Sequence, residues 1–375
     1  MVSLVIAARV GFNLQLGKQL HYNMDAFDCS IPTIDGEEVL ATEDLVAYVP
    51  GVLIGGSGTT MCITDDGPEN CPQGYLVVLD VRSGTPKLSK GKIVGEPKEF
   101  PFHPHGISYS PKSNRLYVIN HGGISSIGSR VEVFSVKQSG LALEFIWIMA
   151  VGSGHVFPNG AINSVTEGAT ENDIYVTRWL SFPVPNKGVK HPESLKERFG
   201  VMVNFLADLL AVYGNTGVYR CVFDVDSKST ISCKYVSYGF VHANGITTNP
   251  ERTKLYVNDP TPRKTYVFNI LEDGELVEDK VIILPHLIDN IHYEDGELWY
   301  ATIPKVHEYL QREHAPVSGT FLVCDPEGND CKDILTFNGS LLSGSSGCAK
   351  VSNGQKTWLA CGSPYGRGVQ MCIAK

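Results

Sequence analysis

The sequence has no uninterrupted apolar stretch of the roughly 18 residues that a membrane-spanning helix needs. The opening segment, MVSLVIAARVGF, is apolar but too short to cross a bilayer, and it includes Arg9. It has neither a basic leader nor an obvious small-residue cleavage site. Two interpretations stay open for it: the remnant of a signal or anchor, or an edge strand. The rest of the chain is not expected to cross a membrane.

Clusters of basic residues are also missing. Lys and Arg number 31 against 40 Asp and Glu, which gives a formal net charge of −9 at pH 7. Binding to a polyanion needs grouped Lys and Arg side chains, so nucleic acid is not expected as a partner. A cation is the better candidate for a charged partner, although surplus carboxylates in most proteins only face solvent.

Two motifs that carry metal or ester chemistry in other proteins are absent. No CxxC pair occurs, which disfavours a zinc site built from thiolates. No GxSxG occurs either, and the GSG and GSSG segments at residues 56–58 and 344–347 are typical of turns rather than of a nucleophile elbow. Ester hydrolysis by a serine nucleophile is therefore not predicted.

The ten cysteines are many for a reducing compartment, and their spacing favours disulfides. Eight form four local pairs that each bracket a polar turn: Cys62 with Cys71, Cys221 with Cys233, Cys324 with Cys331, and Cys348 with Cys361. The other two, Cys29 and Cys372, can be joined only if the fold brings its termini together. An oxidising compartment is expected, and Asn338-Gly339-Ser340 matches the N-glycan acceptor pattern, consistent with secretion.

Glycine and proline separate many short runs rich in Val, Ile and Tyr, a pattern that predicts an all-β protein. One phrase recurs six times: a short polar or Gly-containing step, an apolar residue, a turn, and an aromatic or aliphatic strand. Successive copies start 46 to 81 residues apart, which suits four-stranded blades with their loops. They begin at Thr42, Pro104, Ile162, Ala243, Asp289 and Ser345. We predict a six-bladed β-propeller, a closed ring that would bring Cys29 and Cys372 together.

Polar residues head these phrases, and in a propeller the innermost strand of each blade lines the central channel. Turn or capping chemistry is the alternative role for Asn and Asp at strand ends. Repetition in several blades favours convergence on the axis, where carboxylates and amides form the oxygen cage that calcium takes. The residues are Glu43, Asp44, His105, Asn163, Asn244, Asp289 and Asn290.

A segment at about 180–215 differs from the repeats. SFPVPNKGVKHPESLKERFG leads into VMVNFLADLLAVYG, where apolar residues follow helical spacing. We predict an inserted helix that packs on the propeller flank, covers the channel mouth or contacts a membrane surface. The predicted organisation is thus an apolar N-terminal segment over 1–28 and a single propeller over 29–375.

From about Cys29 to Cys372 the chain resembles the paraoxonases, also called arylesterases or serum lactonases. Each motif is short, but their order and spacing together are fairly specific, and the terminal cysteines match the disulfide that closes that family's ring. The motifs are Glu43-Asp44-Leu45, Pro104-His105-Gly106-Ile107, Asn120-His121, Ala243-Asn244-Gly245-Ile246 and Asp289-Asn290-Ile291.

The resemblance implies two calcium ions in the channel. The deeper, structural ion would use Asp44 and the backbone carbonyl of Ile107. The family usually has Asp after its third-blade Asn, whereas here Ser164 follows Asn163, and losing that charge should weaken the deeper site. Two residues are also inserted just before Asn163. The upper, catalytic ion would be held by Glu43, Asn163, Asn244, Asp289 and Asn290.

The resemblance further implies hydrolysis of lactones and of aryl or carboxylic esters, with calcium polarising the substrate carbonyl. His105 would be the base that activates water, and His121 would lie behind it. The structural alternatives are a channel-lining His105 and a core His121 that only form hydrogen bonds.

Two other functions remain open. One is a calcium-stabilised propeller without catalysis that acts as an interaction module, since propellers have many unrelated functions. The other is a strictosidine-synthase-like or gluconolactonase-like propeller, which explains the terminal cysteines and the two histidines less well. The expected location is extracellular, or membrane-associated on the luminal or extracellular side.

Overall fold

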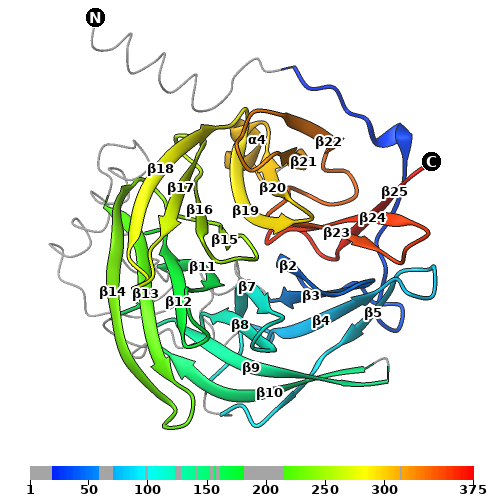
Figure 1. The fold of residues 1–375 in the computed structure, drawn as a ribbon. Coiled ribbons are helices and arrows are strands. Elements are labelled where there is room, and N and C mark those ends of the chain that lie inside the picture. Colours follow the sequence, from blue (N-terminus) through cyan, green and yellow to red (C-terminus); the bar gives the residue numbers. More distant parts are fainter. Residues whose placement is uncertain are drawn as a thin grey trace, which may run out of the picture.

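Six sheets surround a common axis in the computed structural model (Figure 1). It describes residues 19–58, 71–97, 100–122, 128–140, 142–152, 156–157, 161–180, 215–312 and 315–375. Within these ranges five sheets have four strands and one has five. The chain is therefore an all-β, six-bladed propeller, as predicted.

Blades 1 to 3 follow the chain order. Blade 1 contains β2 (Thr42–Val49), β3 (Val52–Ser57), β4 (Tyr75–Asp80) and β5 (Lys87–Lys90). Blade 2 contains β7 (Pro104–Ser110), β8 (Arg115–Asn120), β9 (Arg130–Ser139) and β10 (Ala142–Val151), with β6 (Lys92–Val94) added parallel to β10. Blade 3 contains β11 (Ile162–Glu167), β12 (Asp173–Arg178), β13 (Thr216–Asp224) and β14 (Ser229–Phe240).

Blades 4 to 6 complete the ring. Blade 4 contains β15 (Ile246–Thr248), β16 (Lys254–Asp259), β17 (Lys264–Ile270) and β18 (Leu276–Ile283). Blade 5 contains β19 (Leu287–Glu294), β20 (Glu297–Ile303), β21 (Gly319–Cys324) and β22 (Cys331–Phe337). Blade 6 contains β23 (Gly347–Ser352), β24 (Thr357–Gly362), β25 (Gln370–Ala374) and, from the other end of the chain, β1 (Phe27–Ser30).

The six repeated phrases coincide with the innermost strands of the blades, which confirms the interpretation of the repeats as blades. These strands are β2, β7, β11, β15, β19 and β23, and each contacts the next around the ring, with β23 returning to β2. The polar heads of the phrases therefore lie around the axis.

The hydrophobic core lies between neighbouring blades. Val52 and Ile54 of blade 1 pack in one cluster with Leu116 and Val118 of blade 2. The second strand of a blade is buried on both faces, so it has a continuous apolar run instead of an alternating one, as in the segment from Leu116 to Ile119. Burying each such side chain stabilises the fold by roughly 1.5–3 kcal/mol.

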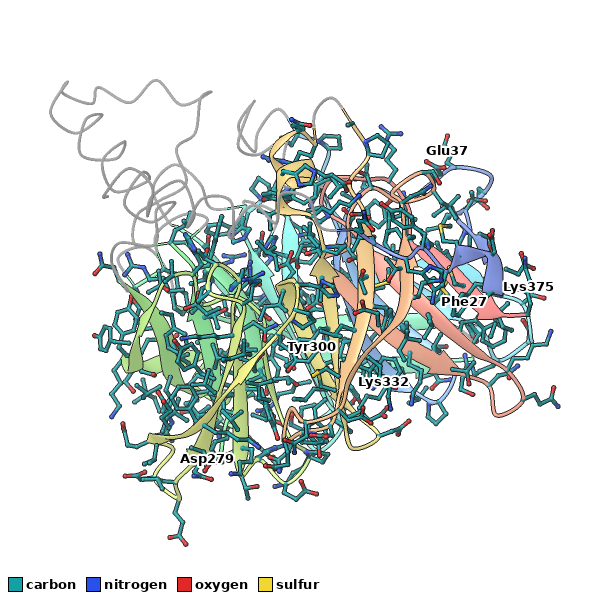
Figure 2. The ribbon with its side chains drawn as sticks, turned by 90° about the horizontal axis from the view of Figure 1, so that it is seen from above. Phe27, Glu37, Asp279, Tyr300, Lys332 and Lys375 are labelled. Carbon is teal, nitrogen blue, oxygen red and sulfur yellow. A yellow bond between two sulfur atoms is a disulfide. The ribbon has the colours of Figure 1, made fainter. Side chains whose placement is uncertain are left out.

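Blade 6 closes the ring with both ends of the chain. β1 pairs antiparallel with β25, and Cys29 is opposite Cys372, to which it is bonded across 343 residues. Figure 2 shows Phe27 and Lys375 on the same side of the molecule. The predicted bonds Cys221–Cys233, Cys324–Cys331 and Cys348–Cys361 are also present, and each joins directly paired residues of adjacent strands. Cys62 lies outside the described residues, so its pairing with Cys71 remains a prediction.

The predicted insertion at about 180–215 lies between β12 and β13, almost wholly outside the described residues. Elsewhere in the described chain the helical elements are a short 3-10 turn, η1 (Met24–Ala26), and α4 (Val306–Leu310) between β20 and β21. No helix among the described residues is long and apolar enough to cross a membrane.

The terminal disulfide should be the most stabilising of the bonds described above. In the chain-entropy model the stabilisation grows with the loop that is closed, to on the order of 5 kcal/mol for Cys29–Cys372 against about 3 kcal/mol for Cys221–Cys233. We expect the double substitution Cys29→Ser/Cys372→Ser to lower the free energy of unfolding, measured with urea, by more than Cys221→Ser/Cys233→Ser does. Equal losses in the two variants would contradict this ranking.

Candidate functional site

Glycines in the inner strands, or directly before them, let neighbouring blades approach at the axis. A Cβ atom at Gly245 of blade 4 would lie 2.6 Å from the carbonyl oxygen of Asp289 in blade 5. One at Gly347 of blade 6 would lie 2.5 Å from Cα of Asp44 in blade 1, and Gly106 of blade 2 abuts the backbone of Asn163 in the same way. Real Cβ atoms essentially never approach other atoms this closely, so a side chain at these positions would force the strands apart.

β-Bulges lie at the residues predicted for the site. The regular register between the first and second strands is broken between Thr42 and Asp44, between Pro104 and Ile107, between Ile162 and Val165, and between Ile288 and Ile291. These interruptions contain Glu43, His105, Asn163, Asp289 and Asn290. A bulge disrupts the ladder locally and re-aims a side chain, which explains how consecutive residues can both contribute to one site.

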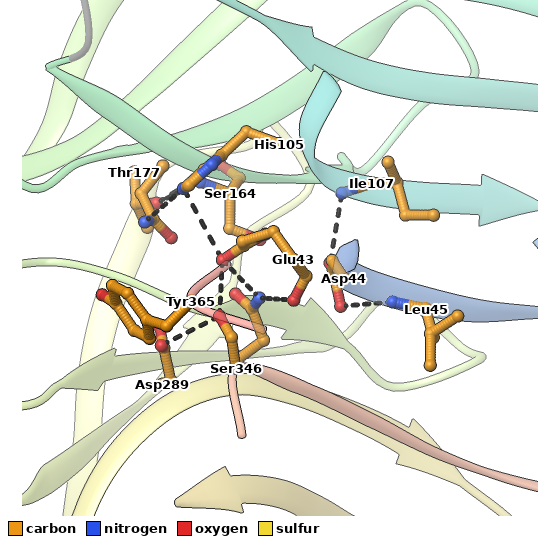
Figure 3. A network of polar contacts seen from close by, with 12 residues as sticks. Glu43, Asp44, Leu45, His105, Ile107, Ser164, Thr177, Asp289, Ser346 and Tyr365 are labelled. Atoms are coloured by element: carbon orange, nitrogen blue, oxygen red, sulfur yellow. Dashed lines mark hydrogen bonds and ion pairs between the residues drawn. The ribbon is translucent and has the colours of Figure 1, made fainter. Parts of the chain in front are cut away.

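Glu43 is the centre of a buried polar network (Figure 3). Its Oε1 accepts hydrogen bonds from Asn290 Nδ2 and Ser346 Oγ, both at 2.9 Å. Ser346 Oγ also lies 2.9 Å from Asp289 Oδ2. One hydroxyl has a single proton, so it can donate to only one of the two carboxylates at a time.

His105 borders the same network. Its Nε2 accepts a hydrogen bond from Asn163 Nδ2 at 3.1 Å and lies 3.5 Å from Glu43 Oε1. The ring centroid of His121 lies 4.9 Å from that of His105, and His121 Nδ1 is 2.8 Å from Ser129 Oγ. The two histidines predicted for catalysis are thus neighbours, and His105 is the one that faces the carboxylates.

Asp44 points to a different set of partners. Ile107 N donates to its Oδ2 at 3.1 Å, and Leu45 N donates to its Oδ1 at 2.9 Å (Figure 3). His292 Nε2 donates to the same Oδ1 at 2.9 Å. The contact between Asp44 and Ile107 therefore runs through the backbone N–H of Ile107.

The buried carboxyl groups disfavour their charged forms. Burial raises the pKa of Glu43 well above its ordinary value, and the negative charges of Asp44 and Asp289 raise it further. Burial also raises the pKa of Asp289 to about 7, against hydrogen bonds from Ser346 and Asn244 that lower it. At neutral pH, either a bound proton or a nearby cation would therefore stabilise this pair of carboxyl groups.

The two histidines shift in the opposite direction. Burial lowers the pKa of His105 to about 4, although the charge of Asp44 acts against this. Burial, followed by repulsion from His105 and His103, lowers the pKa of His121 well below its ordinary value. Both rings are therefore neutral at physiological pH, as a general base must be.

Four buried oxygen atoms around the axis have no hydrogen-bond partner among the residues that the structure describes. They belong to blades 1, 3, 4 and 5, and all are acceptors: Glu43 Oε2, Asn163 Oδ1, Asn244 Oδ1 and Asn290 Oδ1. Buried polar atoms are normally paired, so a converging set of unpaired acceptors fits a hard cation that oxygen atoms would coordinate. Among the described residues no group of three or more His, Cys, Asp or Glu could hold a metal ion. A cation here would therefore depend on the amides as well as on Glu43 and Asp289.

Sequence reasoning missed Ser346 and His292. Ser346 belongs to the sixth phrase, but its role needs ring closure, because it links Glu43 of the first blade to Asp289 of the fifth. His292 lies two residues after Asn290, and that spacing was a usable signal because alternate residues of a strand share a face.

Two tyrosines that were not predicted from the sequence lie beside Asp289. Tyr309 of α4 and Tyr365 are joined through their hydroxyl groups at 2.7 Å, and Arg312 lies over both rings. Burial raises the pKa of Tyr365 well above its ordinary value, and repulsion from Tyr309 and Asp289 adds to this. Both hydroxyl groups therefore remain protonated near Asp289.

Comparison with known proteins gives consistent matches. The family model described as Arylesterase matches residues 204–364. Serum paraoxonase/lactonase 3 of Oryctolagus cuniculus is 25% identical over 281 residues, which cover 72% of this chain and 70% of that protein. Serum paraoxonase/arylesterase 2 of Homo sapiens is 23% identical over 305 residues, covering 79% and 76%. The corresponding protein of Rattus norvegicus is 29% identical over 282 residues, covering 73% and 70%.

Enlarging Gly245 should separate blades 4 and 5 at the site. We expect Gly245→Ala to lower the free energy of unfolding by about 1–3 kcal/mol, because the new methyl group meets backbone that cannot move aside without shifting a strand. Gly58→Ala is the matched control, since its methyl group would lie 3.4 Å from Pro104 Cδ, an ordinary contact. Chemical denaturation measures both, and a Gly245→Ala variant as stable as the control would refute the packing argument.

Proposed function

The chain is a distant relative of the paraoxonase/arylesterase family, and on that premise we propose that it is a calcium-dependent hydrolase of lactones and of aryl or carboxylic esters. The observation that carries the proposal is the set of four unpaired buried oxygens beside a neutral His105. The oxygens suit a hard cation, and the imidazole suits proton abstraction. A binding module would have use for the first feature but none for the second.

The residues around the axis fit calcium at the upper position. Glu43 and Asp289 would supply negative charge, and the side-chain oxygens of Asn163, Asn244 and Asn290 would supply neutral ligands. When bound, the ion acts as a Lewis acid that stabilises the negative charge developing on a substrate carbonyl oxygen. The repulsion that raises the pKa of Glu43 and Asp289 would be relieved by the same cation.

His105 is the proposed general base. Its Nε2 is an acceptor on the side that faces Asn163 and Glu43, so the neutral ring has its proton on Nδ1. A water molecule on the Nε2 side could therefore pass a proton to the imidazole. Asn163 Nδ2 fixes the ring orientation in the absence of substrate.

His121 is proposed as the residue behind the base. Its ring packs against that of His105 at 4.9 Å, and Ser129 Oγ fixes its Nδ1. His105 Nδ1 has no hydrogen-bond partner within the described chain. The contact between the rings is therefore one of packing, and His121 limits the tilt of His105 rather than sharing its proton in the resting protein.

Secretion is proposed on the disulfides. Four bonds are described, and such bonds persist in oxidising compartments. Asn338 is exposed, and its side chain accepts a hydrogen bond from Ser340 N in a turn, so the proposed glycan acceptor is accessible. The proposed partners are small-molecule lactones or esters; contact with a membrane surface through the N-terminal segment or the insertion at about 180–215 is a further proposal that rests on sequence alone.

Removing calcium should abolish hydrolysis and lower thermal stability. A panel of lactones and aryl esters, assayed with calcium and with excess chelator, measures the first effect, and the midpoint of thermal unfolding measures the second. Calcium at 100 times its dissociation constant would stabilise the fold by about 2.7 kcal/mol. Full hydrolysis in excess chelator would refute the proposed cofactor. Stabilisation by calcium with no turnover of any substrate would favour the non-catalytic propeller.

Replacing His105 should remove the base and leave calcium binding intact. We expect His105→Gln to lower kcat for lactones by about 100-fold or more, the usual scale of lost general-base catalysis. His21→Gln, on an exposed side chain, is the matched control.

The pH profile tests the same assignment. A base whose pKa is about 4 is unprotonated above that value, so wild-type activity should be lost only as the pH falls through about 4. Saturating calcium is needed, because protons on Glu43 and Asp289 compete with the cation at higher pH. The variant should lack this acidic limb. A variant with near-normal kcat and an unchanged limb would place the base elsewhere.

A further inference from the structure

Asp44 is buried in the channel, and protein donors already occupy most of its carboxylate. Oδ1 accepts from Leu45 N and from His292 Nε2, and Oδ2 accepts from Ile107 N. A carboxylate has about four lone-pair directions, so three are used. Asp44 is 1% exposed and has no buried atom without a partner.

The neighbouring Glu43 has the opposite environment. Its Oε2 has no partner among the described residues, and neither do the side-chain oxygens of Asn163, Asn244 and Asn290 in other blades. Two adjacent carboxylates of β2 therefore meet their need for positive charge differently. Glu43 has donors on Oε1 alone and leaves Oε2 unpaired, whereas both oxygens of Asp44 accept from donors that belong to the chain.

The other residues expected around Asp44 do not supply a cation site. Ser164 has no carboxylate, and its backbone N–H and carbonyl are both paired with Thr177 Oγ1, at 3.0 and 3.3 Å. Ile107 presents an N–H donor to Asp44. Calcium takes six to eight oxygen ligands, and the set here is one carboxylate with a single open lone pair and the backbone carbonyl of Ile107. The deeper of the two predicted calcium positions therefore does not fit the residues present.

We propose that the imidazole of His292 takes the place of the second calcium ion, so that this chain has one cation position at its axis instead of two. His292 comes from β19 of blade 5 and reaches Asp44 in β2 of blade 1. It satisfies the same carboxylate that a deep ion would use, with a donor that belongs to the chain, although it ties blade 1 to blade 5 rather than to blade 2. The inference concerns the Asp44 position alone and does not require that the protein hydrolyse esters.

Counting bound calcium tests the proposal on the intact protein. Metal-free protein is dialysed to equilibrium against buffered calcium, and the bound ion is measured by elemental mass spectrometry for the wild type, Asp44→Asn, and the double variant Asn244→Ala/Asp289→Asn. We expect one ion per chain in the wild type, one in Asp44→Asn and none in the double variant.

Two ions in the wild type, with one lost in Asp44→Asn, would overturn the proposal. So would one ion that remains in Asn244→Ala/Asp289→Asn and disappears when Asp44→Asn is added. A wild type that binds no calcium would refute the proposed cofactor of the upper position while agreeing with an Asp44 closed to cations, so the two ideas fail in distinguishable ways.

The reciprocal variant creates the missing site. Ser164→Asp/His292→Ser replaces the donor on Asp44 with a small side chain and adds a carboxylate, and we expect it to bind one more calcium ion per chain than the wild type. His292→Ser alone is the control and should gain none, because one carboxylate is a weak ligand set. A properly folded double variant with an unchanged calcium count would contradict the proposal that His292 and Ser164 keep calcium away from Asp44.

Discussion

The close approach of inner strands across Gly106, Gly245 and Gly347 is the constraint on which the site depends. Each glycine packs against the backbone of the next blade beside a candidate site residue, so the side chains of that blade converge on the axis instead of standing apart. The packing serves three alternate interfaces, blade 2 with 3, blade 4 with 5, and blade 6 with 1. The bulges add to this convergence, because they turn consecutive residues such as Asp289 and Asn290 out of the regular hydrogen-bond ladder.

Convergence has an electrostatic consequence. Bringing Glu43 and Asp289 together with Asp44 in a buried channel disfavours the charged forms of Glu43 and Asp289, as their raised pKa values indicate. The structure meets this electrostatic demand differently at Asp44 and at Glu43. At Asp44 it supplies backbone N–H groups and His292, which make that part of the channel complete without a ligand. At Glu43 it leaves oxygens unpaired, and a site that is incomplete in this way is suited to binding rather than to holding the fold together.

The sequence was most informative where a pattern repeats or a residue type is scarce. The phrases starting at Pro104 and Ala243 mark inner strands, because a tight turn followed by a doubly buried strand leaves the same pattern in each blade. The bond between Cys29 and Cys372 was predictable because neither cysteine has a partner nearby in the sequence. The contact of His292 with Asp44 was not predictable in this way, because it joins residues 248 apart and strand alternation says only which face His292 shares. Ser346 was missed for a related reason, since a serine in a Gly-rich phrase has no distinguishing pattern.

Ring closure and site assembly are physically coupled. Ser346 of blade 6 contacts Glu43 of blade 1. From blade 5, Asn290 also contacts Glu43, and His292 contacts the neighbouring Asp44. The site therefore spans the seam where the last blade returns to the first, and blade 6 is itself completed by the pairing of β1 with β25 from opposite ends of the described chain. Such pairings are slow because the loop must close before contacts reward it. The Cys29–Cys372 bond fixes this seam, so the covalent closure of the fold also holds together the residues proposed for binding and catalysis.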